Sequence, residues 1–281
     1  MKLCRYGSVG LEKPGLIDGD RRLRDLSGIV DDIGPNELSP RGLKTLAAVQ
    51  PESLPLVNGK PRFGVPCVGI GKFIAIGLNY SDHAREAGLP VPTEPVVFMK
   101  AITCISGPND DVIQPKHSTK LDWEVELGVV IGTEALYVGE SEALNHVAGY
   151  CIVNDVSERS FQMATTQWDK GKGFDTAGPI GPWLVTADEI RDPQALDMSL
   201  DVNGKRMQSG NTRTMIFGVA RIVSHVSHYM RLRPGDIIAT GTPPGVGLGI
   251  KPTPVFLKPG DVMTLAIDGL GEQRQTVVPC G

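Results

Sequence analysis

The sequence lacks an excess of charge of either sign, and this absence narrows the range of partners. The 281 residues include 28 Lys and Arg against 32 Asp and Glu, a formal net charge of −4. Nonspecific electrostatic binding to nucleic acid or to an anionic membrane requires an excess of Lys and Arg over Asp and Glu, so we expect neither partner. No segment approaches the roughly 18 consecutive apolar residues of a membrane span, and the first residues include no apolar core of signal-peptide length.

Cysteine is also scarce, and its spacing excludes the common cysteine-based sites. The five cysteines are far apart and include no CxxC pair (Cys4, Cys67, Cys104, Cys151 and Cys280). This spacing argues against a zinc knuckle or a redox motif. A reducing, cytoplasmic location fits this cysteine usage best.

Glycine and proline, in contrast, are abundant, with 34 Gly and 22 Pro. Their excess over the usual proportion predicts frequent turns and few long helices. Hydrophobic residues at 41% and charged residues at 21% are ordinary for a folded chain with a sizeable core. Composition therefore excludes global disorder and predicts a strand-rich, loop-rich fold.

The chain divides into a small leading unit, residues 1–69, and a larger unit, residues 70–281. The leading unit has short strand-like pieces and a charged helical stretch near 40–50, and it ends in a segment whose prolines and glycines are typical of a linker. The larger unit consists mostly of short apolar runs at close spacing, which predicts a mainly β structure with α+β character. Its helical signals lie at the ranges 81–87, 157–166 and 216–230.

The most informative segment is LDWEVELGVVI, residues 121–131. Read with the period of a strand, its large apolar side chains share one face, whereas Asp122, Glu124 and Glu126 share the other. One interpretation is the solvated outer face of an edge strand. The other interpretation is a functional site, in which a cation lies between Glu124 and Glu126 and offsets the repulsion between their carboxylates.

A third carboxylate bears on this choice. Asp155 ends the apolar run 148–155, and strand ends are frequent positions for functional residues. Asp155 followed by Glu158 also matches a helix capping box, so a structural role is open as well. Three carboxylates from neighbouring strands, without a nearby His or Cys in the sequence, would suit Mg²⁺, Mn²⁺ or Ca²⁺ rather than Zn²⁺.

A second candidate group lies in residues 77–88. If Ser81 opens a short helix, His83 and Glu86 fall at positions i and i+3 and lie on one face. A carboxylate beside an imidazole orients the ring and raises its basicity, which suits deprotonation of a water molecule. An exposed ion pair on a surface helix is the alternative. The glycine and prolines that follow would allow residues 81–93 to form a flap.

Three further stretches carry weaker signals. Lys172 lies in a glycine-flanked turn, where it could approach an anionic ligand or simply be solvated. The loop 240–247 follows an expected strand and could offer backbone N–H groups to a carboxylate, but it lacks the Gly-Lys-Ser/Thr ending of a nucleotide P-loop. The polar stretch 208–212 could line a site or end a hairpin.

Taken together and in order, these motifs resemble the fumarylacetoacetate hydrolase family. They are GLNYSDHAREAG, DWEVELGVVIG, VNDVSER, KGKGFDTAGPIGP, QSGNTRT and GDIIATGTPPGVG. The resemblance covers roughly residues 70–279. It implies a mixed β-sandwich roll behind a small N-terminal domain, a divalent metal that is usually Mg²⁺ or Mn²⁺, with Ca²⁺ possible in crystals, and a homodimer.

The resemblance also implies roles for individual residues. Glu124, Glu126 and Asp155 match the metal ligands of the family. His83 and Glu86 match its water-activating pair, in which Glu86 orients His83.

Further residues match positions that meet the substrate. Lys172 matches the lysine that contacts substrate oxygens near the metal. Arg159 and Gln162 match polar residues beside the site, and Thr242 lies in the glycine-rich loop that meets the substrate carboxylate.

Within the family the chain looks most like bacterial hydrolases of 2,4-diketo-3-deoxy sugar acids of the L-fuconate or L-rhamnonate type, and some close relatives carry a ureidoglycolate lyase label. We therefore expect metal-dependent hydrolysis of a C–C bond in a 2,4-diketo acid, a sugar acid or an acylpyruvate, giving pyruvate and a carboxylic acid. The same metal site also serves oxaloacetate decarboxylases, so the lyase and decarboxylase reactions are alternatives. A metal- or ligand-binding module without catalysis is the competing class.

Overall fold

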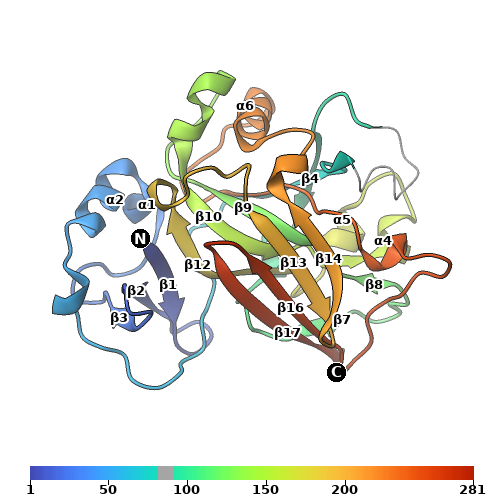
Figure 1. Cartoon of the computed structure of the whole chain (residues 1–281), viewed down its shortest axis with the longest axis horizontal. Coiled ribbons are helices and arrows are strands. Elements are labelled where there is room, and N and C mark those ends of the chain that lie inside the picture. The colour runs from blue at the N-terminus through green and yellow to red at the C-terminus, as the bar shows by residue number, and fades with distance from the viewer. Residues whose placement is uncertain (82–90) are drawn as a thin grey trace.

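The computed structural model describes residues 1–81 and 91–281 (Figure 1). The predicted helix at 81–87, with His83 and Glu86, therefore lies outside the described residues except for Ser81. Within the described part of the chain, no helix is both long and apolar enough to cross a membrane.

A ten-stranded mixed sheet forms the centre of the molecule. Its strands are β1 (Lys2–Tyr6), β2 (Lys13–Ile17), β3 (Leu23–Asp25), β4 (Phe73–Gly77), β5 (Val96–Lys100), β6 (Ile105–Ser106), β9 (Val125–Ile131), β10 (Val147–Asn154), β12 (Gly178–Thr186) and β15 (Ile237–Ala239). Their order is β3-β2-β1-β12-β10-β9-β15-β4-β5, with β6 paired to β12. The pairs β15–β4 and β12–β6 are parallel, and the other pairs are antiparallel.

A second sheet of five strands packs against the first. It consists of β7 (Val112–Gln114), β13 (Asp197–Val202), β14 (Lys205–Asn211), β16 (Val262–Ile267) and β17 (Gly271–Pro279), in the order β14-β13-β16-β17-β7. Side chains of β16 alternate between buried and partly exposed, as expected for a strand with one face on a core. Figure 1 shows this sheet lying across β9, β10 and β12. The predicted mainly β fold with mixed sheets is confirmed.

The helices are short and lie at the margins of the sheets. They are α1 (Pro35–Leu38), α2 (Pro40–Ala47), α4 (Arg159–Gln162), α5 (Asp169–Lys172) and α6 (Val219–Tyr229), with 3₁₀ turns η1 (Pro51–Ser53), η2 (Ile102–Cys104), η3 (Glu140–His146), η4 (Ala187–Glu189), η5 (Thr212–Thr214) and η6 (Gly247–Gly249). The helices predicted near 40–50 and at 216–230 are confirmed as α2 and α6.

The helix predicted over residues 157–166 is largely wrong. Ser157 and Glu158 form β11 (Ser157–Glu158), which pairs with β8 (Leu121–Asp122), and only the four residues of α4 are helical. The Glu158 carboxylate caps α4 by accepting a hydrogen bond from the Phe161 N–H at 2.7 Å. Glu158, rather than Asp155, therefore caps this helix, and the capping role considered for Asp155 is wrong.

The strand predicted over 121–131 is interrupted at Trp123 and Glu124, which separate β8 from β9. All seven residues of β9 are buried, and this strand lies between β10 and β15 in the main sheet. Pairing along both edges and the burial of every residue thus leave β9 without a solvated face. The interpretation of an edge strand with a solvated face is wrong.

The leading residues extend the main sheet. β1 pairs with β12, with Leu3 opposite Leu184, and Figure 1 places α1, α2 and β1–β3 on the left of the view, away from α4 and α5. A small separate core includes Cys4, Tyr6 and Ile17. The division at residue 69 stays a prediction.

Candidate metal and substrate site

Three buried carboxylates converge where β9 begins and β10 ends. One oxygen of each of Glu124, Glu126 and Asp155 lies within 4.8 Å of one oxygen of each of the others. The register of the antiparallel pair places Asn154 opposite Val125, which brings the end of β10 beside the start of β9. The Asp155 N–H donates to the carbonyl of Glu124 at 2.9 Å and fixes this approach. The structure therefore brings together the three acids that the sequence singled out.

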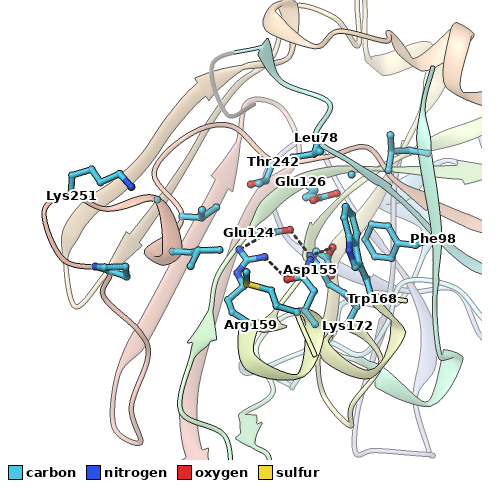
Figure 2. A pocket seen from close by; sticks show the side chains of 18 residues that line it. Leu78, Phe98, Glu124, Glu126, Asp155, Arg159, Trp168, Lys172, Thr242 and Lys251 are labelled. Atoms are coloured by element: carbon cyan, nitrogen blue, oxygen red, sulfur yellow. Dashed lines mark hydrogen bonds and ion pairs between the residues drawn. The ribbon is translucent and has the colours of Figure 1, made fainter. Parts of the chain in front are cut away.

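Cations of the protein itself contact these acids (Figure 2). The Lys172 ammonium lies 2.7 Å from Glu124 Oε2 and 2.7 Å from Asp155 Oδ2. The Arg159 guanidinium donates to Glu124 Oε1 at 2.6 Å. Burial disfavours the charged form of Lys172, but Asp155 and Glu124 outweigh it and raise the pKa of the ammonium. Lys172 thus stays charged between the two carboxylates.

Sequence reasoning missed a second buried lysine at this site. Lys100 ends β5, and its ammonium donates to Asp155 Oδ1 at 2.5 Å, to the Lys172 carbonyl at 2.5 Å and to the Ala177 carbonyl at 3.1 Å. Its three N–H groups are all satisfied, as a buried ammonium requires. The only signal in the sequence is a lysine that ends the apolar run VVFMK.

Asp122 holds Arg159 in place. The Arg159 Nε donates to Asp122 Oδ2 at 2.8 Å, and the same carboxylate accepts the N–H groups of Gly247 and Leu248 at 2.6 and 3.0 Å. Burial opposes the charge of Arg159, but Asp122 and Glu124 outweigh it and raise the pKa of the guanidinium. Asp122 therefore positions Arg159 and stands apart from the three clustered acids.

Glu126 is the acid whose charge is least compensated. Burial raises its pKa well above the ordinary value, the nearby charges of Asp155 and Glu124 raise it further, and Lys172 and the N–H of Gly241 lower it. The Gly241 N–H donates to Glu126 Oε2 at 2.7 Å. The loop 240–247 thus does offer an N–H to a carboxylate, and the acceptor is a side chain of the protein.

The donor set fits a divalent cation. All three groups are carboxylates, which Mg²⁺ and Mn²⁺ prefer, and their oxygens are close enough to share one ion. Burial first, and then the charges of Asp155 and Glu124, raise the pKa of Glu126, and a cation bound among the three acids would favour its charged form. A cation bound here would share Glu124 and Asp155 with Lys172.

A cavity of about 540 Å³ opens beside the acids. Its lining includes every predicted site residue that the structure describes, namely Glu124, Glu126, Asp155, Arg159, Gln162, Lys172 and Thr242. The remaining wall is mostly apolar, formed by Ile76, Leu78, Phe98, Met163, Trp168, Val246, Leu248 and Pro254, with Lys251 also on it. The sequence alone did not indicate these wall residues.

The hydroxyl of Thr242 is already engaged. It donates to the Val125 carbonyl at 2.9 Å and accepts from Gln208 Nε2 at 2.8 Å. Gln208 is fully buried, and its Oε1 accepts the Val125 N–H at 3.0 Å. The polar stretch 208–212 therefore supports the start of β9 through Gln208. Gln162 contacts Arg159, whose Nη1 donates to its Oε1 at 3.0 Å.

One side of the cavity is shaped by two aromatic rings. Phe98 on β5 and Trp168 before α5 pack edge to face, with ring centroids 5.3 Å apart. Trp168 lies so close to Gly77 that a Cβ there would be 2.5 Å from the ring. Leu78, the next residue, has a φ of 55°, a strained value for a leucine that places it on the cavity wall.

The family model for the fumarylacetoacetate (FAA) hydrolase C-terminal domain matches residues 72–278. The chain belongs to the fumarylacetoacetate hydrolase family. A relative from Burkholderia ambifaria, named provisionally as a hydrolase, is 63% identical over 278 residues, which cover 98% of each chain. The resemblance seen in the sequence motifs is therefore confirmed at the level of the family.

Solved structures agree with this membership of the fumarylacetoacetate hydrolase family. The fumarylacetoacetate hydrolase of Exiguobacterium antarcticum is 35% identical, with a TM-score of 0.89 and full coverage of both chains. Maleylpyruvate hydrolase of Sphingobium sp. SYK-6, solved with manganese(II) ion and pyruvate, is 29% identical, with a TM-score of 0.84 and full coverage. A further similar structure, 31% identical, is described as 5-carboxymethyl-2-hydroxymuconate delta-isomerase from Mycobacterium smegmatis. The family thus includes hydrolases, and similar structures are also named as isomerases.

Proposed function

We propose that this chain is a hydrolase that depends on a divalent metal and cleaves a C–C bond of a 2,4-diketo acid, giving pyruvate and a carboxylic acid. The observation that carries the proposal is the convergence of Glu124, Glu126 and Asp155 with Lys172 beside one cavity. The similar maleylpyruvate hydrolase that binds manganese and pyruvate supports it. Sugar acids and acylpyruvates are the two substrate classes that the sequence predicts.

Glu124, Glu126 and Asp155 would hold Mg²⁺ or Mn²⁺. When bound, such an ion supplies Lewis-acid polarisation of the substrate oxygens and neutralises negative charge in the site. Glu126 lies on β9, and Glu124 and Asp155 lie directly beside the paired ends of β9 and β10, where the Asp155 N–H donates to the Glu124 carbonyl. The main sheet therefore positions all three carboxylates.

Lys172 and Arg159 would act on the substrate anion. Breaking the C3–C4 bond leaves its electron pair on the pyruvate fragment as an enolate, which then takes up a proton to give pyruvate. The Lys172 ammonium, held by Glu124 and Asp155, is placed to stabilise that developing charge by a charge-assisted hydrogen bond. Gln162 and Thr242 are proposed to contact the substrate beside it.

The attacking water requires a base. We keep His83, oriented by Glu86, in this role: the imidazole would accept a proton from the water as its oxygen bonds to C4 of the substrate. That oxygen becomes part of the carboxylic acid product. The flap predicted over 81–93, of which 82–90 lie outside the described residues, and the predicted homodimer are not needed for this step and stay predictions.

The similar structures named as isomerases favour one alternative, a metal-assisted proton shift on a related unsaturated oxo acid. This reaction would use the same acids and Lys172 without adding water or breaking a C–C bond. The lyase and decarboxylase reactions would likewise leave 2,4-diketo acids intact.

The test is product analysis from a substrate panel. Purified protein is incubated with acylpyruvates, a 2,4-diketo-3-deoxy sugar acid, oxaloacetate, ureidoglycolate and an unsaturated oxo dioic acid, each with Mg²⁺, Mn²⁺ or EDTA. We expect pyruvate and a matching carboxylic acid only with metal, and no turnover by Glu124→Gln. Turnover of oxaloacetate alone to pyruvate and carbon dioxide, of ureidoglycolate alone to glyoxylate and urea, or of the unsaturated acid alone to its isomer would overturn the proposal in favour of the corresponding alternative.

A further inference from the structure

We infer that a second cavity, on the side of the molecule formed by β1–β3, is a binding site for a small aromatic carboxylate. This cavity has a volume of about 670 Å³, and its lining comes from the hairpin of β2 and β3, the segment 56–63, Asn109 and β12. It shares no lining residue with the cavity beside the three acids. Figure 1 shows β2 and β3 at the opposite side of the molecule from α4 and α5. The inference is therefore independent of the proposed function.

The lining of this second cavity is basic, although the whole chain has a net charge of −4. Arg21, Arg22 and Lys60 line it, and no Asp or Glu is among the described residues of the lining. An anion that enters would meet cations on the wall and no charge of its own sign. The distribution of charge thus favours an anionic ligand.

Two of these three cations are available to a ligand. Arg22 is already paired, because its guanidinium lies 3.2 Å from the carboxylate of Asp18 and 2.5 Å from that of Asp20. Within residues 1–81 and 91–281, in contrast, the side chains of Arg21 and Lys60 have no ion-pair or hydrogen-bond partner. A ligand carboxylate would gain a charge-assisted hydrogen bond from either side chain without breaking an existing contact.

The apolar part of the lining includes two aromatic rings. Phe63 and Trp183 pack edge to face, with ring centroids 6.2 Å apart, beside Ile17 and Leu23 of the small separate core. Both aromatic side chains are half-buried, so each retains surface that a ligand can cover. Aromatic rings gain from contact with other rings in addition to the gain from burying apolar area. An aromatic body therefore fits this wall better than a polyhydroxylated one.

Hydrogen bonds hold the walls of the second cavity in place before any ligand binds. The Asp18 carboxylate accepts the Arg22 N–H at 2.8 Å, which fixes the turn between β2 and β3. The Val57 N–H donates to the Leu23 carbonyl at 2.9 Å and attaches the segment 56–63 to that hairpin. The main chain that carries the two available cations is thus preorganised, and little loss of backbone entropy opposes binding.

The test compares 2-naphthoate with two ligands that each lack one required feature. The amide 2-naphthamide has the same rings without the charge, and octanoate has the carboxylate without the rings. Each ligand is titrated calorimetrically into the protein in EDTA. We expect 2-naphthoate to bind about fivefold more tightly than either, and its advantage over the amide to shrink at high salt. No binding of 2-naphthoate, or equal binding of either comparison ligand, would overturn the inference.

Two double variants test whether the available cations are responsible. Arg21→Met combined with Lys60→Met should make the affinities of 2-naphthoate and 2-naphthamide about equal. Arg41→Met combined with Lys44→Met is the matched control, because it removes the same two charges from exposed positions of α2 that do not line the cavity. The control should retain the fivefold preference. A preference that survives in the first double variant, or that is lost equally in the control, would overturn the inference.

Two single variants distinguish this cavity from the one beside the acids. Phe63→Leu removes a ring from the second cavity and should weaken the binding of 2-naphthoate and 2-naphthamide by a similar factor, about threefold. Trp168→Leu removes a ring from the wall of the other cavity and should leave both affinities unchanged. Weaker binding in Trp168→Leu with normal binding in Phe63→Leu would place the ligand beside the acids and overturn the inference.

Discussion

The ammonium of Lys100 lies 2.5 Å from Oδ1 of Asp155, and both side chains are almost completely buried. The other oxygen of Asp155 contacts Lys172, so one carboxylate bridges two lysines. Removing a charged partner from such a network leaves an uncompensated charge in a medium of low dielectric constant. The acids are therefore held in place by cations of the protein before any metal binds, and this has measurable consequences.

Lys100→Met should destabilise the metal-free protein by about 3–5 kcal/mol, because Asp155 loses a buried ion pair. A divalent cation can replace part of the lost positive charge. Mn²⁺ should consequently raise the melting temperature of Lys100→Met by more than it raises that of the wild type, as measured by thermal unfolding with Mn²⁺ or EDTA.

Lys72→Met is the matched control for this prediction. Lys72 contacts the buried carboxylate of Asp236 at 2.6 Å, and neither residue lines the cavity. Its loss should lower stability but leave the Mn²⁺-induced shift at the wild-type value. An equal shift in Lys72→Met and Lys100→Met would show that Lys100 has no special relation to the metal site.

Lys172→Met should separate metal binding from turnover. Lys172 shares Glu124 and Asp155 with the proposed metal, so removing its charge should leave Mn²⁺ affinity unchanged or increase it. Loss of its ammonium from the developing enolate should lower kcat by roughly 100-fold or more. Calorimetry and steady-state kinetics measure the two effects. Weaker Mn²⁺ binding with normal kcat would contradict the assigned role.

Gly77→Ala should change the shape of the cavity. The added Cβ would lie 2.5 Å from the Trp168 ring, which must move. Because Trp168 is partly exposed on the cavity wall, we expect a loss of stability of only about 1 kcal/mol and a rise in KM of about tenfold. Kinetics and thermal unfolding on the same sample test both parts.

Gly171→Ala provides the contrasting case. Its Cβ would lie 2.4 Å from the backbone nitrogen of Gln162, so α4 and α5 would have to separate. We expect a loss of about 3 kcal/mol together with lower kcat, since Arg159 and Lys172 lie on these two helices. Equal effects of the two substitutions would contradict the packing described at both positions.

Asp18, which lies outside the candidate site, should make the stability of the protein depend on pH. Desolvation opposes its charge, but hydrogen bonds from the Arg22 backbone and the Arg24 guanidinium outweigh it and lower the pKa to about 2. A carboxyl whose pKa is lower in the folded than in the unfolded protein stabilises the folded protein at pH values above its unfolded pKa, roughly 3.9. This stabilisation is lost as the pH falls through the folded pKa of about 2.

Asp18→Asn should therefore be less stable than the wild type at pH 7, and the gap should close as the pH falls below about 4. Urea unfolding of both proteins over this range measures the gap. A difference that stays constant down to acid pH would mean that the Asp18 carboxylate does not carry the effect.

The sequence predicted the members of the acid cluster because the alternation of side chains along a strand, and the point where an apolar run ends, are local patterns. Glu124, Glu126 and Asp155 lie at the ends of two apolar runs, and antiparallel pairing of those runs brings them together. The sequence did not predict the interruption at Trp123, because its causes are distant: the Trp123 indole donates to the Gly245 carbonyl, and Val125 donates to Gln208.

The cavity wall and Lys100 were missed for the same reason. Lys100 contacts Asp155 and the Lys172 carbonyl, far along the chain, and its ordinary position at the end of a strand gives no sign of either contact. Trp168 faces the cavity because Gly77 leaves room for its ring. Such relations depend on tertiary packing and have no local pattern.

The most direct test of the central claim is a complete product balance for one acylpyruvate with Mn²⁺. The reaction is run in ¹⁸O-labelled water, NMR measures the amounts of substrate and products, and mass spectrometry measures the label in the acid. The account predicts equal amounts of pyruvate and carboxylic acid, with water oxygen in the acid, and no reaction with EDTA or in Glu126→Gln. Unchanged turnover in EDTA and in Glu126→Gln, or consumption of the substrate without pyruvate, would contradict it.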